Sequence, residues 1–387
     1  MNRDRVLIDY SKKTLQEYHV SAVPFVGLQQ EFAERRQLLT AAFESVGHSA
    51  SYILRDDVRA FEAAIADKLA VKFAIGVNSG TDALFLALKA LGIGAGDEVI
   101  TVAHTFVATL AAIVHCGAKP VLIDIGQDFN LAPDALQAAI TPATKAIIPV
   151  HMNGRCCDMP AILAIADQYG VSVVEDAAQA LGAHIDGRYA GSFGRLGAFS
   201  LHPMKNLHCY GDGGLVTTND PLLAEKIRML RNHGQNENKD LMAFGFNSRL
   251  DNLQAALLNV NLRYFADDID RRRQIAARYH VGLSDCQAVR LPVSCQPTGY
   301  FDVFSAYPIL CRDRDGLIRH LHSRHIECFV HWPQPLHLNP HLQLAPVSLP
   351  MTEQVAREVL SLPIHPFLDD AQCDYVIASV REFAGGR

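Results

Sequence analysis

Strand-like and helix-like segments alternate along this chain from about residue 58 to residue 175, and this alternation constrains the fold more than any other feature. Short apolar runs such as AIIPV and VSVVE alternate with segments whose apolar residues recur at helical spacing. This repeat predicts right-handed crossovers within a mostly parallel sheet that helices cover on both faces. The continuous apolar strands fit that burial. Ligands of such sheets bind beyond the carboxyl ends of the strands.

A chain of 387 residues is long enough for about two domains. Strand-like runs around Phe199 and Val216 extend the sheet, and a long helical stretch from Asp251 towards Tyr279 leads to a second unit. We expect an N-terminal arm (residues 1–35), a large α/β domain (36–260) and a small C-terminal α+β domain (261–387). Further strands are expected over 73–77, 99–103, 121–125, 146–151, 171–175, 304–310 and 328–332, and helices over 58–69, 81–91, 106–115, 134–140, 159–168 and 314–323.

Composition excludes several classes of protein. The net charge of −6 and the lack of a dense Lys/Arg tract argue against nucleic-acid binding. No apolar stretch reaches the ~18 residues that a membrane helix needs, and the N-terminus lacks the apolar core of a secretion signal. The nine cysteines are odd in number and form no CxxC pair, which favours reduced thiols over disulfides. We therefore expect a cytoplasmic protein without a nucleic-acid or membrane partner.

A candidate phosphate site follows the predicted strand 73–77. Asn78, Ser79, Gly80 and Thr81 open the next predicted helix, whose first turn presents unpaired N–H groups and a positive dipole end. Gly80 would allow an anion to approach closely, and the hydroxyl of Ser79 or Thr81 adds a donor. The alternative is that Asn78 or Ser79 only caps the helix. The segment matches neither GxGxxG nor a Walker loop, which disfavours a dinucleotide or a nucleoside triphosphate.

Two further residues follow predicted strands at the same edge of the sheet. Asp176 comes directly after the strand 171–175 and could pair with a protonated ring nitrogen of a ligand. At 4 Å and an effective dielectric constant near 20, such a pair is worth roughly 4 kcal/mol, or nearly three pKa units. The alternatives for Asp176 are a helix cap or a metal ligand. Phe106 could stack on a flat ring, or it could belong to the core.

Lys205 lies between an apolar run and a glycine-rich turn that contains Gly211, Gly213 and Gly214. An amine held beside backbone that can approach a ligand closely is suited to bonding a carbonyl carbon. The alternative is a surface lysine in a loop. A second possible site is the histidine-rich tail between His320 and His341, but its spacing matches no zinc motif. A GxSxG elbow is absent, so serine hydrolase chemistry has no support.

Five motifs together resemble one family. They are, in order, NSGTDAL, TFVAT, EDAAQALGA, FSLHPMKNLHCYGDGG and GFNSRLDNLQAALL, and a later segment, VHWPQPLH, resembles the same family's small-domain signature. Their order and spacing resemble the DegT/DnrJ-type sugar aminotransferases over nearly the whole chain, from about Val23 to LSLPIHPFLDD. The resemblance implies the aspartate-aminotransferase fold (fold type I), with a large sheet domain that binds pyridoxal 5′-phosphate and a small C-terminal domain.

The resemblance also implies roles for individual residues. Lys205 matches the lysine that bonds the aldehyde carbon of the cofactor and then moves protons as base and acid. Asp176 matches the carboxylate that faces the pyridine nitrogen, and Phe106 matches the aromatic residue that stacks on the ring. Asn247 matches an asparagine that reaches the phosphate from the second subunit of an obligatory homodimer. The remaining matches are Gly80, Thr81 and Ser200 as phosphate contacts and Gln179 as a polar neighbour of the ring.

The expected reaction is transfer of an amino group from L-glutamate to a keto-sugar. The resemblance makes a nucleotide-linked 4-keto-6-deoxy or 3-keto sugar the first expectation, for surface polysaccharides such as lipopolysaccharide or for antibiotics. A keto-octulosonic acid is an alternative acceptor. The rival functions are a non-catalytic sugar sensor and a metal-dependent enzyme. Lysine rather than histidine at position 205 favours transamination over dehydration, and the departures from the family pattern at Arg55, His208 and Cys209 are candidate substrate determinants.

Overall fold

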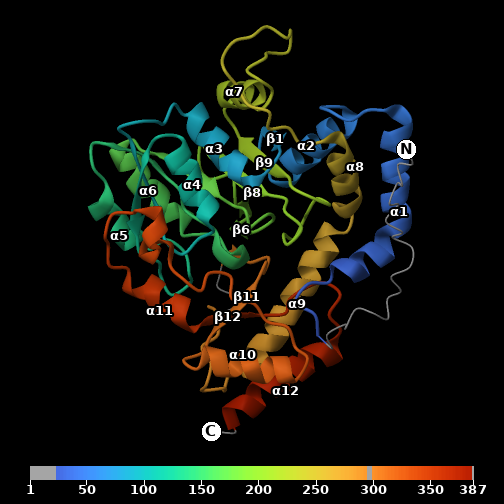
Figure 1. Ribbon diagram of the computed structural model, residues 1–387, viewed down its shortest axis with the longest axis vertical. Coiled ribbons are helices and arrows are strands. Elements are labelled where there is room, and N and C mark those ends of the chain that lie inside the picture. The colour runs from blue at the N-terminus through green and yellow to red at the C-terminus, as the bar shows by residue number, and fades with distance from the viewer. Residues whose placement is uncertain (1–22, 294–298, 386–387) are drawn as a thin grey trace, which may run out of the picture.

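The central sheet has seven strands in the order β1-β9-β8-β5-β4-β2-β3. Its strands β1, β9 and β8 are labelled in Figure 1. The computed structural model describes residues 23–293 and 299–385. β9 runs antiparallel to its neighbours β1 and β8, and the other neighbouring strands are parallel. The predicted α/β fold with a mostly parallel sheet is confirmed. The strands are β1 (Phe73–Val77), β2 (Glu98–Val102), β3 (Lys119–Ile123), β4 (Thr144–Ile147), β5 (Ser172–Asp176), β8 (Leu196–Ser200) and β9 (Gly214–Thr218).

Helices cover both faces of this sheet. One face carries an apolar cluster with Leu84, Leu88 and Ile227, and the opposite face carries a second cluster with Phe61 and Ile162. The first face is covered by α3 (Gly80–Ala90), α4 (Val107–His115) and α7 (Pro221–Arg231). The second is covered by α2 (Asp56–Lys68), α5 (Pro133–Ala139), α6 (Met159–Tyr169) and α8 (Asn252–Asn261), and α1 (Leu28–Ser49) packs outside α8.

Local sequence signals set the ends of these helices. The Ser79 hydroxyl accepts a hydrogen bond from the Asp82 N–H at 3.1 Å, which caps α3. Asp158 caps α6, and Gly170 ends it with a positive φ of 65°. Asp220 caps α7, with Pro221 in its first turn. These three helices are therefore begun by side chains of the turns that precede them.

The C-terminal part has its own apolar core, below the sheet domain in Figure 1. Tyr279, Tyr307 and Leu317 lie in that core and are fully buried. The elements here are α9 (Phe265–Leu283), β11 (Tyr307–Leu310), α10 (Arg314–Ser323), α11 (Pro350–Glu358), β12 (Val359–Leu362) and α12 (Asp370–Gly385), with β11 antiparallel to β12. A small sheet joins β6 (His184–Ile185), β7 (Arg188–Tyr189) and β10 (Tyr300–Phe301), and 3₁₀ turns span Met152–Gly154, Leu336–Leu338 and Pro340–Leu342.

Four expected elements differ from the structure, and one of them is the strand expected over 146–151, which ends at Ile147. The stretch from Asp251 to Tyr279 is two helices, because the N–H groups of residues 263–265 bond the carbonyl three residues back and turn the chain more tightly. The strand expected over 304–310 begins only at Tyr307. Residues 328–332 are not a strand, since only Phe329 pairs, in an isolated bridge to Ser361.

The expected domain boundaries fall within or beside helices. The boundary after residue 35 lies inside α1, and residues 1–22 of the expected arm lie outside the described residues. The boundary after residue 260 lies at the end of α8. The division into three parts therefore stays a prediction.

Within residues 23–293 and 299–385, no helix is both long and apolar enough to cross a membrane. All eight cysteines in these ranges are free, and Cys295 lies outside them. This agrees with the expectation of reduced thiols.

Candidate active site

The carboxyl ends of β1, β2, β5 and β8 meet at one edge of the sheet, because these four strands run in the same direction. Asp176 is the last residue of β5, and Ser200 is the last residue of β8. Gly80 begins α3 after β1, and Phe106 precedes the first residue of α4 after β2. Four segments that lie far apart in the sequence thus bring predicted site residues to the edge where ligands of such sheets bind.

The start of α3 packs closely against the last residue of β8 and the first residue of β9, and together they form a cradle. A Cβ atom on Gly80 would lie 2.7 Å from the Ser200 Cβ, and one on Gly214 would lie 2.2 Å from the Ser79 carbonyl oxygen. Because Gly80 and Thr81 are in the first turn of α3, their N–H groups have no partner inside the helix. With the exposed Thr81 hydroxyl, these donors and the dipole of α3 fit a phosphate group.

Asp176 is almost fully buried, with 5% of its surface exposed. Its Oδ2 accepts a hydrogen bond from the Thr109 hydroxyl at 2.8 Å, and its Oδ1 accepts one from the Ala178 N–H at 3.2 Å. Burial raises the pKa of Asp176, while these two hydrogen bonds and the Lys205 ammonium act in the opposite direction. Each carboxylate oxygen keeps a further lone pair, which could accept an N–H from a ligand.

Glu175 precedes Asp176 and points to the opposite side of β5. It is fully buried and accepts hydrogen bonds from three backbone N–H groups of residues 191–194 at 2.6–2.8 Å. It also lies 2.8 Å from Nε2 of the buried His151. The two neighbouring carboxylates therefore differ in their surroundings: Glu175 ties β5 to the rest of the domain, and Asp176 faces the carboxyl edge.

Lys205 lies on the loop after β8 and is half-buried. Burial lowers the pKa of Lys205, and the nearby Asp176 carboxylate opposes this shift. The two groups are therefore close enough for each to change the pKa of the other. A lowered pKa increases the fraction of neutral amine at neutral pH, and the neutral amine is the form that attacks a carbonyl carbon.

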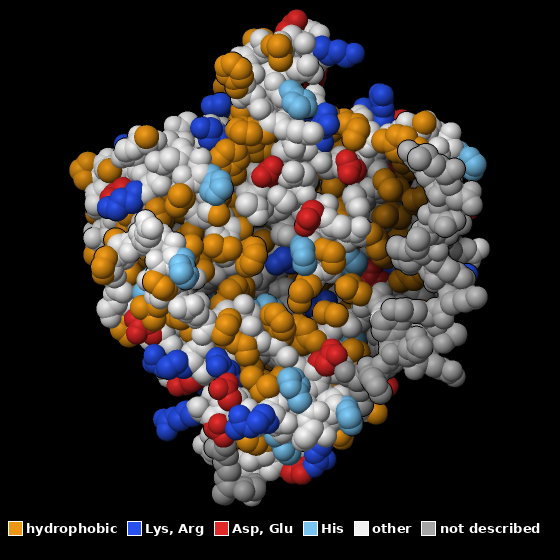
Figure 2. All heavy atoms as spheres, in the orientation of Figure 1, with side chains coloured by type: hydrophobic (Ala, Val, Ile, Leu, Met, Phe, Trp, Pro, Cys, Tyr) orange, Lys and Arg blue, Asp and Glu red, His pale blue; other side chains and the backbone are white. Residues whose placement is uncertain are grey.

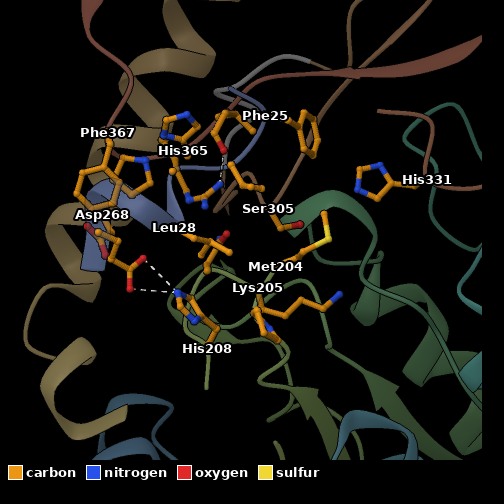
Figure 3. Close-up of a pocket in the computed structure, with 18 residues that line it drawn as sticks. Phe25, Leu28, Met204, Lys205, His208, Asp268, Ser305, His331, His365 and Phe367 are labelled. Atoms are coloured by element: carbon orange, nitrogen blue, oxygen red, sulfur yellow. Dashed lines mark hydrogen bonds and ion pairs between the residues drawn. The ribbon is translucent and has the colours of Figure 1, made fainter. Parts of the chain in front are cut away.

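A cavity beside Lys205 separates this loop from the C-terminal part (Figure 3). Lys205, Met204 and His208 line one wall, and Figure 3 shows His331 and His365 on other walls. Burial, with the Lys205 charge, lowers the pKa of His331 to about 4, so its imidazole is neutral at neutral pH. The cavity therefore lies between Lys205 and residues of the C-terminal part.

His208 ties the Lys205 loop to distant helices. Its Nε2 lies 3.1 Å from a Glu31 carboxylate oxygen of α1. Glu31 lies 3.2 Å from Arg35, which donates to Asp268 of α9 at 2.7 Å. His208, one of the positions that depart from the family pattern, is thus part of the wall of the cavity and also an anchor of its loop.

The other predicted site residues lie as follows. Phe106 has 60% of its surface exposed, so it does not belong to the core. The Gln179 Oε1 accepts a hydrogen bond from the Asn153 N–H at 2.9 Å. Asn247 is exposed at the base of the loop between α7 and α8, and its neighbour Ser248 donates to the Asn78 side chain at 3.2 Å.

A model of the DegT/DnrJ/EryC1/StrS aminotransferase family matches residues 34–381. This chain belongs to that family. Among curated relatives, dTDP-3-amino-3,4,6-trideoxy-alpha-D-glucose transaminase of Streptomyces venezuelae is 44% identical over 94% of this chain and 96% of the relative. UDP-N-acetyl-3-dehydro-alpha-D-glucosamine 3-aminotransferase of Acidithiobacillus ferrooxidans is 41% identical over 95% of this chain and 99% of the relative.

Solved structures agree with the family assignment. S. venezuelae DesV, in complex with a ketimine intermediate, is 44% identical and superposes with a TM-score of 0.90, covering 94% of this chain and 98% of DesV. NtdA of Bacillus subtilis, with bound cofactor PMP, is 30% identical with a TM-score of 0.87, covering 95% of this chain and 86% of NtdA. The predicted family, fold and enzyme class are confirmed: the chain is an aminotransferase.

One residue of this aminotransferase site was missed by the sequence analysis. Thr109 donates to Asp176, although the two residues are 67 positions apart. The signal lay in the TFVAT motif itself, whose two threonines, Thr105 and Thr109, stand four residues apart on either side of the start of the predicted helix. The sequence does not show which strand these threonines face.

The histidine-rich tail does not form a metal centre in the part of the chain that the structure describes, where no three His, Cys, Asp or Glu side chains could share an ion. His320 contacts the Ser379 carbonyl oxygen, His337 lies beside Glu353, and His331 lines the cavity near Lys205. These histidines therefore serve separate places in the aminotransferase.

Proposed function

We propose that this aminotransferase moves an amino group from L-glutamate to the carbonyl carbon of a nucleotide-linked 3-keto sugar. Pyridoxal phosphate is its cofactor, as the family resemblance implies. The observation that carries the proposal is that the charges of Lys205 and Asp176 influence each other's pKa. Both residues lie at the edge of the sheet where Gly80 and Ser200 pack closely. The two curated relatives named above support a sugar acceptor and favour position 3 over a 4-keto-6-deoxy sugar.

The donor set of the site fits pyridoxal phosphate. We assign the phosphate to the first turn of α3, with Gly80, Thr81 and Ser200, and the ring nitrogen to Asp176. Phe106, which is largely exposed, would stack on the ring, and Gln179 would lie beside it. When bound, the cofactor supplies an aldehyde carbon that exchanges amines and a cationic ring that takes up negative charge.

Lys205 then has two tasks. Its amine would hold the cofactor at the aldehyde carbon until the donor's amine takes its place. Its free Nζ would accept the proton from the donor's Cα and return it to the former aldehyde carbon, and it would move protons in the opposite order when the sugar is aminated. The burial that lowers the pKa of Lys205 favours the first step of this proton transfer, because a neutral amine must accept the proton.

A matched substrate panel tests the function. We expect the purified protein with L-glutamate to aminate a nucleotide-linked 3-keto sugar and to release one 2-oxoglutarate per amino sugar, both followed by mass spectrometry. Nucleotide-linked 4-keto-6-deoxy sugars and a keto-octulosonic acid are the competing acceptors, and other amino acids are the competing donors. A faster reaction with either competing acceptor would overturn the choice of sugar. Failure to exchange amino groups with any donor would favour the sugar sensor.

We infer a homodimer with shared sites from the surface of the chain. The loop between α7 and α8 projects from the molecule, and Figure 2 shows hydrophobic side chains at its tip. Leu241, Met242 and Phe244 on this loop are 74%, 62% and 102% exposed, which is costly for a monomer in water. A second copy would cover this tip, and the exposed Asn247 at its base would then reach the partner's phosphate.

Subunit mixing tests the shared site. We expect Lys205→Ala and Asn247→Asp each to be inactive alone, the second because a carboxylate would repel the phosphate. Mixed subunits should regain about a quarter of the wild-type activity, since half of the dimers would be mixed and each would hold one intact site. If Asn247 acts within its own subunit, mixing restores nothing. A monomer in sedimentation measurements would also contradict the inference.

The location and pathway remain part of this proposal. Eight free cysteines in the described residues are compatible with a reducing compartment, which supports the cytoplasm. Nucleotide-linked amino sugars are building blocks for glycosyl transfer, so we assign the product to surface polysaccharide, including lipopolysaccharide, or to antibiotic assembly.

A further inference from the structure

Two buried hydroxyl groups form consecutive hydrogen bonds that end at the Asp176 carboxylate. The Thr105 and Thr109 hydroxyl oxygens are 2.7 Å apart, and the Thr109 oxygen is 2.8 Å from Asp176 Oδ2. Thr105 and Thr109 are each 1% exposed, and Asp176 is 5% exposed. Hydrogen bonds that are buried away from water are strong, and the loss of a donor there leaves a buried acceptor unsatisfied.

The direction of these two hydrogen bonds follows from the chemistry of the groups. An ionised carboxylate only accepts hydrogen bonds, so Thr109 must give its single proton to Asp176. The Thr109 oxygen can then only accept a hydrogen bond from the Thr105 hydroxyl. Thr105 therefore donates to Thr109, and Thr109 donates to Asp176. A donor that itself receives a hydrogen bond is polarised and stabilises the carboxylate more strongly.

Thr109 is also in the first turn of α4, so its hydrogen bond places the N-terminal turn of this helix beside the carboxylate. The positive end of the helix dipole favours an anion there. Phe106 precedes the same turn and is exposed, while the two threonines are buried, so one turn presents an aromatic face outwards and hydroxyl groups inwards. The turn thus controls both the ring-stacking residue and the partner of the ring nitrogen.

We propose that Thr109, oriented by Thr105, is a positioning residue that keeps Asp176 ionised and aimed at the ring nitrogen of the cofactor. The inference rests on the proposed role of Asp176. The hydrogen bond from Thr109 opposes the effect of burial, which on its own favours the protonated form of Asp176. The remaining donor to Asp176 is the Ala178 N–H, and the other titratable groups that face it are Lys205 and His151.

Three variants test this role. Thr109→Val removes the hydroxyl and keeps the shape, and Thr109→Ser keeps the hydroxyl. Thr101→Val is the matched control, because Thr101 is equally buried but its hydroxyl donates to the Ile148 carbonyl oxygen, at 2.9 Å, and not to Asp176. Each protein is loaded with pyridoxal phosphate that carries nitrogen-15 in the ring, and the ring-nitrogen resonance is recorded as a function of pH.

We expect the ring nitrogen of Thr109→Val to shift towards the neutral-pyridine position, because the proton is shared more with the carboxylate. Without this hydrogen bond the pKa of Asp176 rises, so the acid-side loss of kcat should begin about one pH unit higher, with kcat about tenfold lower. Thr109→Ser and Thr101→Val should keep the wild-type resonance and pH profile. Thr105→Val should show a smaller shift in the same direction.

The outcomes separate this inference from the proposed function. If Thr109→Val matches Thr101→Val in resonance and pH profile while Asp176→Asn is slow, the positioning role is wrong and the role of Asp176 stands. If Asp176→Asn reacts at the wild-type rate, the role of Asp176 itself fails, and the inference fails with it. Loss of stability that is equal in the two valine variants, without a spectral change, also counts against the inference.

Discussion

Replacing Lys205 by alanine is expected to abolish transamination while the protein remains folded. The variant loses the amine to which we assign both the bond to the cofactor aldehyde and the transfer of the Cα proton, so we expect a loss of at least about 10⁴-fold in kcat. Lys205 lies on a loop beside a cavity, and we expect its truncation to change the melting temperature little. The rate is measured as 2-oxoglutarate formed from L-glutamate and the accepted keto-sugar.

Two further variants complete this experiment. Lys205→Arg keeps a positive charge but cannot act as a neutral amine at neutral pH, and it should be as inactive as the alanine variant. Lys119→Ala is the control, because the Lys119 side chain is 65% exposed and pairs with Glu98 at the far end of the neighbouring strands. A Lys205→Ala enzyme with more than a few per cent of wild-type activity would assign the chemistry to another amine.

Asp176→Asn is expected to keep bound cofactor and to slow the reaction about 1,000-fold. The amide preserves the shape of the side chain but cannot hold the ring nitrogen cationic. The lost ion pair is worth roughly 4 kcal/mol at an effective dielectric constant near 20, and this corresponds to about three orders of magnitude in rate. Cofactor binding is measured by absorbance, and Cα proton removal by exchange from deuterated L-glutamate.

The control for Asp176→Asn is Asp124→Asn. Asp124 accepts hydrogen bonds from the Met351 and Thr352 N–H groups, both at 2.8 Å, and so joins the end of β3 to α11. In the described part of the chain, none of the hydrogen bonds to its carboxylate involves a predicted site residue. We expect this variant to lose stability and to keep its rate. If Asp176→Asn instead loses cofactor and its residual rate per bound cofactor is normal, the carboxylate has a binding role only.

Elements with a complete local pattern could be predicted from the sequence to within a residue or two. The run TDALFLALKAL, predicted as a helix over 81–91, forms α3, and the strand over 73–77 agrees with β1. In both segments the apolar residues follow a clear pattern, and polar residues or glycines mark the ends. The failure between Asp251 and Tyr279 has the opposite cause, because no proline or glycine marks the tight turn that splits the predicted helix into α8 and α9.

The strand expected over 328–332 shows a second limit. Its residues have the composition of a strand, but a strand also needs a partner along its length, and only Phe329 finds one, at Ser361. Pairing is a property of the whole fold, so composition alone overestimates it. β4 ends at Ile147 for a different reason: Pro149 has no N–H to donate, although Val150 beyond it still pairs with Asp176 in an isolated bridge.

The candidate site shows the same division between local and distant information. The residues at strand ends, such as Asp176 and Gly80, could be placed because parallel strands deliver their carboxyl ends to one edge. The contacts that tune them join distant segments: Thr109 with Asp176, and Glu31 with His208. Such contacts depend on how helices pack on the sheet, and a single sequence contains no signal for that packing.

Borohydride reduction of the purified protein, followed by mapping of the modified peptide, tests the central claim most directly. The account predicts one stable pyridoxyl adduct per chain, on Lys205, in wild-type protein, and no adduct at any lysine in Lys205→Ala. An adduct on a different lysine of the wild-type protein would contradict it.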